Sequence, residues 1–221
     1  MQIGRTRCDF PAGPCIVLHY PEVPTKIDAF DILRGDDFGE VVFKPGNVWY
    51  AGQEDGYCSS TFNCCTFAVC DYVGLTTADW IATDPMADGF PTPIAVIIDS
   101  YADLICEYSI REAIDLQEFL KDGRLRDNDV VCFERASAES DPLRRRFTHV
   151  GRVQHHNGVN RLLSKFGQGP IARTNLRFPY RMYPGADLIR VYRFRAGESR
   201  PESRLPGFKS TDISVTVPGS V

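Results

Sequence analysis

Long apolar segments are missing from this sequence. No run reaches the roughly 18 apolar residues at which a membrane-spanning helix becomes possible. The N-terminal residues 1–7 also lack the apolar core of a secretory signal peptide. We therefore expect a soluble, cytoplasmic protein with no membrane partner.

A strong excess of one charge is missing as well. Lys and Arg number 25 against 29 Asp and Glu, so the formal net charge is −4. Proteins that bind nucleic acid usually carry a basic surface, and this composition predicts no such partner. The hydrophobic content of 43% is ordinary for a globular protein, and a chain of this length can bury a sizeable core. Nothing in the composition indicates the oligomeric state.

The C-x-x-C spacing typical of zinc sites is absent. An even number of cysteines would suit four disulfides in a secreted protein, but several lie in apolar runs such as 130–133, which favours free thiols. A zinc site remains the alternative, because several possible ligands occur. The eight cysteines are residues 8, 15, 58, 64, 65, 70, 106 and 132. The possible zinc ligands are Cys58, Cys64, Cys65 and Cys70 together with His155 and His156. We expect neither a metal nor another cofactor.

Composition divides the chain into three parts. Residues 1–55 are rich in Pro, Gly and Asp and contain short β-type runs at 15–20, 40–44 and 48–50, which predicts an irregular N-terminal lobe packed on the core. Residues 56–195 hold the longer periodic segments and form the main domain. Residues 196–221 are rich in Gly, Pro and Ser and are expected to be a surface tail.

A cysteine pair opens the most informative helix. Polar residues up to Asn63 offer N-caps, and Phe67, Cys70 and Gly74 recur at i, i+3 and i+7, with Gly74 as the stop. Cys64 then lies in the first turn, where the helix dipole favours thiolate and lowers the cysteine pKa. This pattern is typical of a nucleophile. The alternative is a buried cysteine that only packs.

The remaining elements are helical first and strand-like later. Residues 76–81 predict a short capped helix. Pro93 and the apolar spacing favour helix over strand for 93–105, and Ser109 caps a helix over 110–121. Strands are expected at 130–134, 147–153, 159–163, 172–178 and 188–194, with a tight turn at Asn157-Gly158. Helices followed by an antiparallel meander indicate an α+β fold.

His149 is the candidate general base. Strand alternation predicts that Phe147, His149 and Gly151 share one face, and that Gly151 leaves space beside the imidazole. A thiol at a helix start and a histidine on a meander strand are the parts of papain-type catalysis. The alternative is a half-buried histidine with a satisfied hydrogen bond and no chemical role.

The segment 63–68, Asn-Cys-Cys-Thr-Phe-Ala, resembles the C-x-x-aromatic-Ala motif of NlpC-type and CHAP-type cysteine peptidases and amidases. Residues 129–133, Asp-Val-Val-Cys-Phe, are similar to that family's Gly-Asp-Leu/Val-Val-Phe strand, and 149–151 to its His-Val-Gly strand. Residues 162–167 also resemble a segment of uncharacterised bacterial papain-like domains. The resemblance covers about residues 60–175 and implies a papain-like, NlpC-type fold with helices packed on an antiparallel sheet.

The resemblance assigns catalytic roles. Cys64 matches the nucleophile, in preference to Cys65, because only Cys64 has Phe67 at plus three. His149 matches the base, and the residue that orients it is expected on the following strand, at Asn160 or Ser164. The implied function is a thiol-dependent hydrolase of amide bonds in peptides, peptidoglycan or γ-glutamyl peptides. A catalytically inactive binding module, or an acyltransferase or deamidase with the same dyad, are the alternatives.

Overall fold

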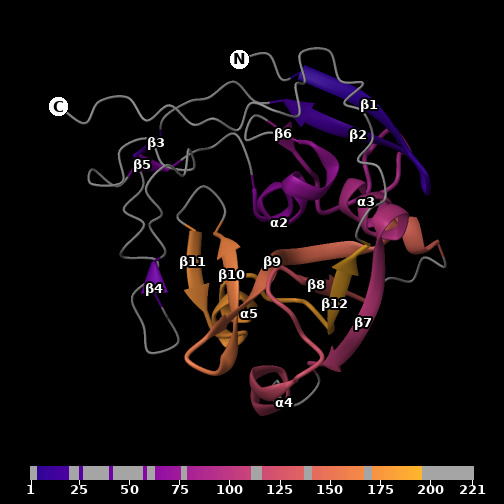
Figure 1. The fold of residues 1–221 in the computed structure, drawn as a ribbon. Helices are drawn as coiled ribbons and strands as arrows, with labels where there is room; N and C mark the ends of the chain where they lie inside the picture. The colour runs from indigo at the N-terminus through magenta and orange to yellow at the C-terminus, as the bar shows by residue number, and fades with distance from the viewer. Residues whose placement is uncertain are drawn as a thin grey trace.

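The protein is a mixed α+β structure built on antiparallel sheets (Figure 1). The computed structural model describes residues 4–19, 25–26, 40–41, 57–58, 63–75, 79–110, 116–136, 141–166 and 171–195. The helices are α2 (Cys64–Val73), α3 (Pro93–Tyr101), α4 (Leu116–Lys121), α5 (Arg177–Met182) and the 3₁₀ turn η2 (Pro142–Arg144). The predicted tail 196–221 and most of residues 20–55 lie outside the described residues.

The largest unit is a seven-stranded sheet in the order β4-β11-β10-β9-β8-β12-β7. Its strands are β4 (Glu40–Val41), β7 (Ala102–Ser109), β8 (Val130–Arg135), β9 (Arg146–His156), β10 (Val159–Lys165), β11 (Ile171–Thr174) and β12 (Leu188–Phe194). All neighbouring pairs are antiparallel. The meander predicted from residue 130 onward is therefore present.

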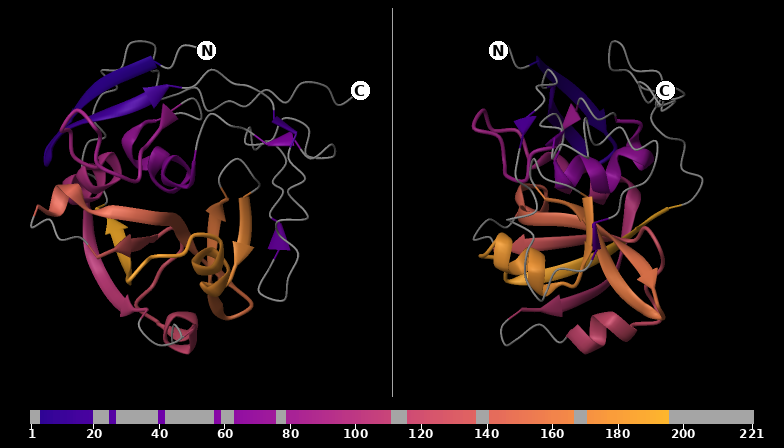
Figure 2. Two further views of the ribbon diagram at one scale, coloured as in Figure 1. Left: turned by 180° about the vertical axis from the view of Figure 1, so that it is seen from behind. Right: turned by 90° about the vertical axis from the view of Figure 1, so that its left-hand side faces the viewer.

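Two helices are sandwiched between this sheet and a smaller one. The small sheet has the order β1-β2-β6, formed by β1 (Gly4–Phe10), β2 (Gly13–His19) and β6 (Asp79–Trp80), while β3 (Thr25–Lys26) pairs with β5 (Tyr57–Cys58). Figures 1 and 2 show α2 and α3 between the small sheet and the large one, with α4 on the opposite side. The apolar faces of α2, α3 and the large sheet form the main core.

The turn between β9 and β10 explains the register of the sheet at the candidate site. His156 pairs with Val159, so the loop holds only Asn157 and Gly158, and both have positive φ, 50° and 76°. Two residues of that kind form a type I′ turn, whose twist matches the twist of the flanking strands. The tight hairpin predicted from Asn157-Gly158 is confirmed.

Four of the predicted elements differ from the structure. Residues 79–80 form strand β6 rather than part of a helix, and residues 76–78 are not described. Helix α3 ends at Tyr101, and the chain continues directly as β7 to residue 109. The described part of the helix expected at 110–121 is α4, at 116–121, and Ser109 belongs to β7. The strand expected at 172–178 is β11 at 171–174 followed by α5.

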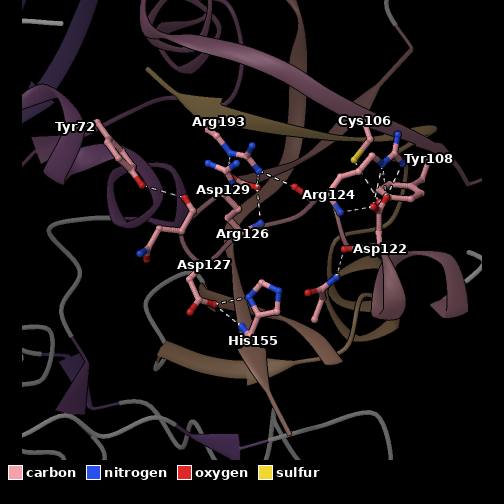
Figure 3. A network of polar contacts seen from close by, with 12 residues as sticks. Tyr72, Cys106, Tyr108, Asp122, Arg124, Arg126, Asp127, Asp129, His155 and Arg193 are labelled. Atoms are coloured by element: carbon pink, nitrogen blue, oxygen red, sulfur yellow. Dashed lines mark hydrogen bonds and ion pairs between the residues drawn. The ribbon is translucent and has the colours of Figure 1, made fainter. Parts of the chain in front are cut away.

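A polar network fixes the edge of the sheet where β8 begins (Figure 3). Arg193 of β12 pairs with Asp129 at 2.7 Å, ahead of β8, and Asp122 accepts hydrogen bonds from Tyr108 and Arg124. These contacts tie α4, β7, β8 and β12 together. Tyr72 of α2 joins the network by donating to the Asn128 carbonyl at 3.0 Å, so the role of these contacts is structural.

Seven cysteines have described side chains, and all seven are free and buried. Within the described residues, no group of three or more His, Cys, Asp or Glu side chains could hold a metal ion. No helix among the described segments is long and apolar enough to cross a membrane.

Candidate active site

Helix α2 begins at Cys64 because Asn63 caps it. The Asn63 side-chain oxygen accepts a hydrogen bond from the Thr66 N–H at 3.0 Å, and the Asn63 carbonyl accepts the Phe67 N–H at 3.0 Å. Helix geometry provides no acceptor for the N–H groups of Cys64 and Cys65, which are earlier in the first turn. Gly74 ends the helix in the left-handed conformation, with φ of 69°, as predicted.

The start of α2 is also fastened to strand β6. The Asn63 amide donates to the Ile81 carbonyl at 2.7 Å, and the Thr66 hydroxyl donates to the Asp79 carbonyl at 2.7 Å. Asn63 and Thr66 are both buried. Hydrogen bonds on either side of Cys64 therefore fix the direction of the first turn, on which any chemistry of the thiol depends.

Strand β9 supplies a fully buried histidine. His149 Nε2 shares a hydrogen bond with Ser164 Oγ of β10 at 2.9 Å. His149 Nδ1 is buried and has no hydrogen-bond partner among the described residues. If Nε2–H donates to Ser164, the Nδ1 lone pair is free to accept a proton.

A β-bulge decides which way this imidazole points. Phe133 of β8 pairs with His149, whereas Glu134 pairs with Phe147, so Thr148 is an extra residue in β9. Phe147 consequently packs in the core beneath α2 and α3, while the His149 ring contacts Phe133, the residue with which it pairs. The prediction that Phe147 and His149 share one face was wrong, because a bulge shifts the alternation by one residue.

Gly151 allows Ser164 to reach the histidine. A Cβ atom at position 151 would lie 2.8 Å from the Cβ of Ser164, 2.8 Å from a methyl group of Leu162 and 2.9 Å from the Leu163 carbonyl oxygen. The room that Gly151 leaves is therefore occupied by β10. Close approach of the two strands at this point requires glycine.

Substituting Gly151 by Ala should therefore destabilise the protein by about 1–3 kcal/mol, the usual cost of overpacking. One of the three contacts is with backbone, which cannot rotate away. Chemical denaturation measures the effect. Gly123→Ala is the matched control, since nothing lies within 4 Å of its added Cβ. Equal stability of the two variants would contradict the close approach.

The surroundings of Cys64 favour the thiolate. The pKa of Cys64 is lowered well below its ordinary value. The causes are a hydrogen bond from the Cys65 thiol, then the charge of His149 and a hydrogen bond from the Val150 backbone. Burial of the sulfur opposes them and is outweighed. The charge of His149 thus acts on the thiol, which also lies at a helix N-terminus.

The pKa of every other described cysteine with a resolved change is raised, not lowered. Burial raises the pKa of Cys8 to about 11 and of Cys70 to about 12, and burial and the contact with Cys64 raise that of Cys65 well above its ordinary value. Cys65 has no exposed surface, whereas Cys64 retains 8%. Cys64 is thus the cysteine of this pair with thiolate character.

The structure brings Ser164, but not Asn160, to His149. Asn160 pairs with His155 farther along β9, and its buried amide donates to the carbonyls of Phe119 and Asp122 at 2.7 and 3.1 Å. It therefore caps the C-terminal end of α4. Both residues lie on the strand expected from the sequence, and the register selects between them.

Sequence reasoning missed two residues that hold the site together. Arg152 of β9 donates to the Ala68 carbonyl of α2 at 3.0 Å and pairs with Asp71 at 2.8 Å, so it clamps the helix to the strand that carries His149. Tyr183 stacks on the imidazole, with ring centroids 4.7 Å apart. Neither residue lies in a motif, and only the tertiary contacts identify them.

Taken together, the site contains a thiol with a lowered pKa, an imidazole held by a hydroxyl, and first-turn N–H groups that have no acceptor within their own helix. This combination can attack an acyl carbon and move a proton. No protein-family model, no curated protein and no solved structure matches the chain.

Proposed function

We propose that this protein is a cysteine-dependent hydrolase of amide bonds with a papain-like, NlpC-type domain. The observation that carries the proposal is the position of Cys64 in the first turn of α2, where the charge of the buried His149 acts on it, while His149 Nε2 is hydrogen-bonded to Ser164. The order of the elements agrees with this type of domain, because the thiol helix precedes the histidine strand and the orienting strand follows.

In this mechanism the Cys64 sulfur attacks the carbonyl carbon of the substrate and forms a tetrahedral intermediate. His149 holds the proton taken from the thiol and passes it to the leaving amine as the carbon–nitrogen bond breaks. The N–H groups of Cys64 and Cys65 are available to stabilise the oxyanion. Water then attacks the thioester, with His149 again accepting the proton. Ser164 orients the imidazole throughout.

The substrate class follows from the family resemblance rather than from a pocket. We propose peptides of the peptidoglycan or γ-glutamyl type as substrates. Neither a metal nor an organic cofactor is needed for the steps above, since the chain's own thiol and imidazole supply nucleophile and base.

Acylation by p-nitrophenyl acetate tests the nucleophile. We expect a burst of p-nitrophenol equal to the protein concentration and an acetyl group on Cys64, identified by mass spectrometry of the digested protein. Hydrolysis of γ-glutamyl peptides and peptidoglycan fragments, measured as newly released amino groups, then tests the substrate class. Absence of acetylation at Cys64 would favour an inactive binding module, and amine-dependent transfer of the acyl group would favour an acyltransferase.

A further inference from the structure

An aromatic cluster lies against the candidate base. Tyr183 caps the C-terminal end of α5, and its ring is nearly parallel to the His149 imidazole, at 11° and 4.7 Å between centroids. Phe166, which follows β10, stacks on the same imidazole at 21° and 5.1 Å. Two segments that follow the histidine strand in the sequence, one after β10 and one after α5, thus converge on one ring.

The two aromatic residues differ in what they offer besides packing. Phe166 is buried and has no polar atom on its ring, whereas Tyr183 is only half-buried and bears a hydroxyl. That hydroxyl has no hydrogen-bond partner within the residues that the structure describes. A phenol beside a reactive group, without a partner of its own, is available as a donor.

The electrostatics of the Tyr183 phenol also involve Cys64. Burial, and after it the negative charge of Cys64, raise the pKa of the Tyr183 phenol. The phenol therefore remains protonated at neutral and moderately alkaline pH. An O–H group that stays protonated near a sulfur nucleophile can donate a hydrogen bond to charge that develops there.

We propose that Tyr183 is a further catalytic residue, whose hydroxyl donates a hydrogen bond to the oxyanion formed when Cys64 attacks an acyl carbonyl. This role rests on the proposed hydrolase function. In the attack, the sulfur–carbon bond forms and the carbonyl π electrons move to the oxygen, where the Tyr183 O–H binds without losing its proton. When the intermediate collapses, the π bond returns and the leaving group departs with the proton from His149.

Two reactions of the same thiol separate this role from simple packing. Acylation by p-nitrophenyl acetate passes through an oxyanion, whereas alkylation by iodoacetamide is a direct displacement that forms none. Tyr183→Phe removes the hydroxyl and keeps the ring on His149. We expect the acylation rate of Cys64 to fall about 100-fold, as for loss of an oxyanion donor. The alkylation rate and its pH profile should stay within about twofold, because the thiolate does not require the donor.

Tyr180→Phe is the matched control, because it removes a hydroxyl from the same helix without touching the imidazole, and both rates should stay unchanged. Thermal unfolding of each variant checks that the fold is intact. Unchanged acylation in Tyr183→Phe would overturn the proposed role and leave the hydrolase function standing. An equal fall in both rates would overturn it too, by showing that the tyrosine only positions the thiolate. A wild-type protein whose Cys64 takes neither reagent would overturn the hydrolase function itself.

Discussion

Replacing Cys64 by Ala should abolish labelling of the protein by low concentrations of iodoacetamide at pH 7 and should remove all acylation and hydrolysis. Among the cysteines with resolved pKa changes, Cys64 is the one whose pKa is lowered, and thiolate is the form that reacts. Mass spectrometry of the labelled protein measures the stoichiometry and the position of the label.

Cys65→Ala is the control for this experiment. The label should stay on Cys64, although more slowly, because the Cys65 thiol donates a hydrogen bond that lowers the pKa of Cys64. Cys65→Ser keeps a donor and should restore most of the rate. Undiminished labelling in Cys64→Ala, together with loss of labelling in Cys65→Ala, would mean that the nucleophile is Cys65.

Replacing His149 by Ala should slow alkylation of Cys64 about 100-fold at pH 6.5. The hydrogen bond from Cys65 and then the charge of His149 lower the pKa of Cys64, and burial raises it, so removing the imidazole lets burial act with less opposition. At pH 6.5 a thiol with an ordinary pKa of about 8.5 is only about 1% thiolate. The alkylation rate of this variant should then keep rising until the pH has passed about 8.5. Iodoacetamide alkylation measured from pH 5 to 10 records this rise.

The matched control is His155→Ala, which removes an exposed histidine from the same strand, one that pairs with Asp127 at 2.9 Å. Its alkylation profile should match that of the wild type. Since deleting a buried ring leaves a cavity, His149→Gln provides a second variant that fills more of the space. A wild-type profile in both His149 variants would rule out the imidazole as the partner of the thiol.

Much of the helix and hairpin geometry could be predicted because its signals are local. Asn63 caps α2 through its own side chain, Gly74 supplies the left-handed residue that ends it, and Asn157-Gly158 forms the turn between β9 and β10. Each signal depends on residues no more than four positions apart. The position of Cys64 at a helix start was predictable for this reason.

The rest depends on contacts between distant segments. The choice between Ser164 and Asn160 follows from the register of β10 against β9, and the direction of His149 follows from the bulge at Thr148. Neither has a distinct sequence pattern, because a one-residue shift leaves the composition unchanged. Residues 102–109 continue the apolar spacing of α3 yet extend to pair with β12, so tertiary pairing outweighs local preference there.

The pH dependence of Cys64 alkylation in the wild-type protein tests the central claim most directly. A lowered pKa means that thiolate persists as the pH falls, so the alkylation rate should keep its plateau down to a midpoint below about 7.5, the range of catalytic cysteines. The label should map to Cys64 alone under these conditions. A midpoint at or above about 8.5 would contradict the account, because Cys64 would then be an ordinary buried thiol beside a histidine without a chemical role.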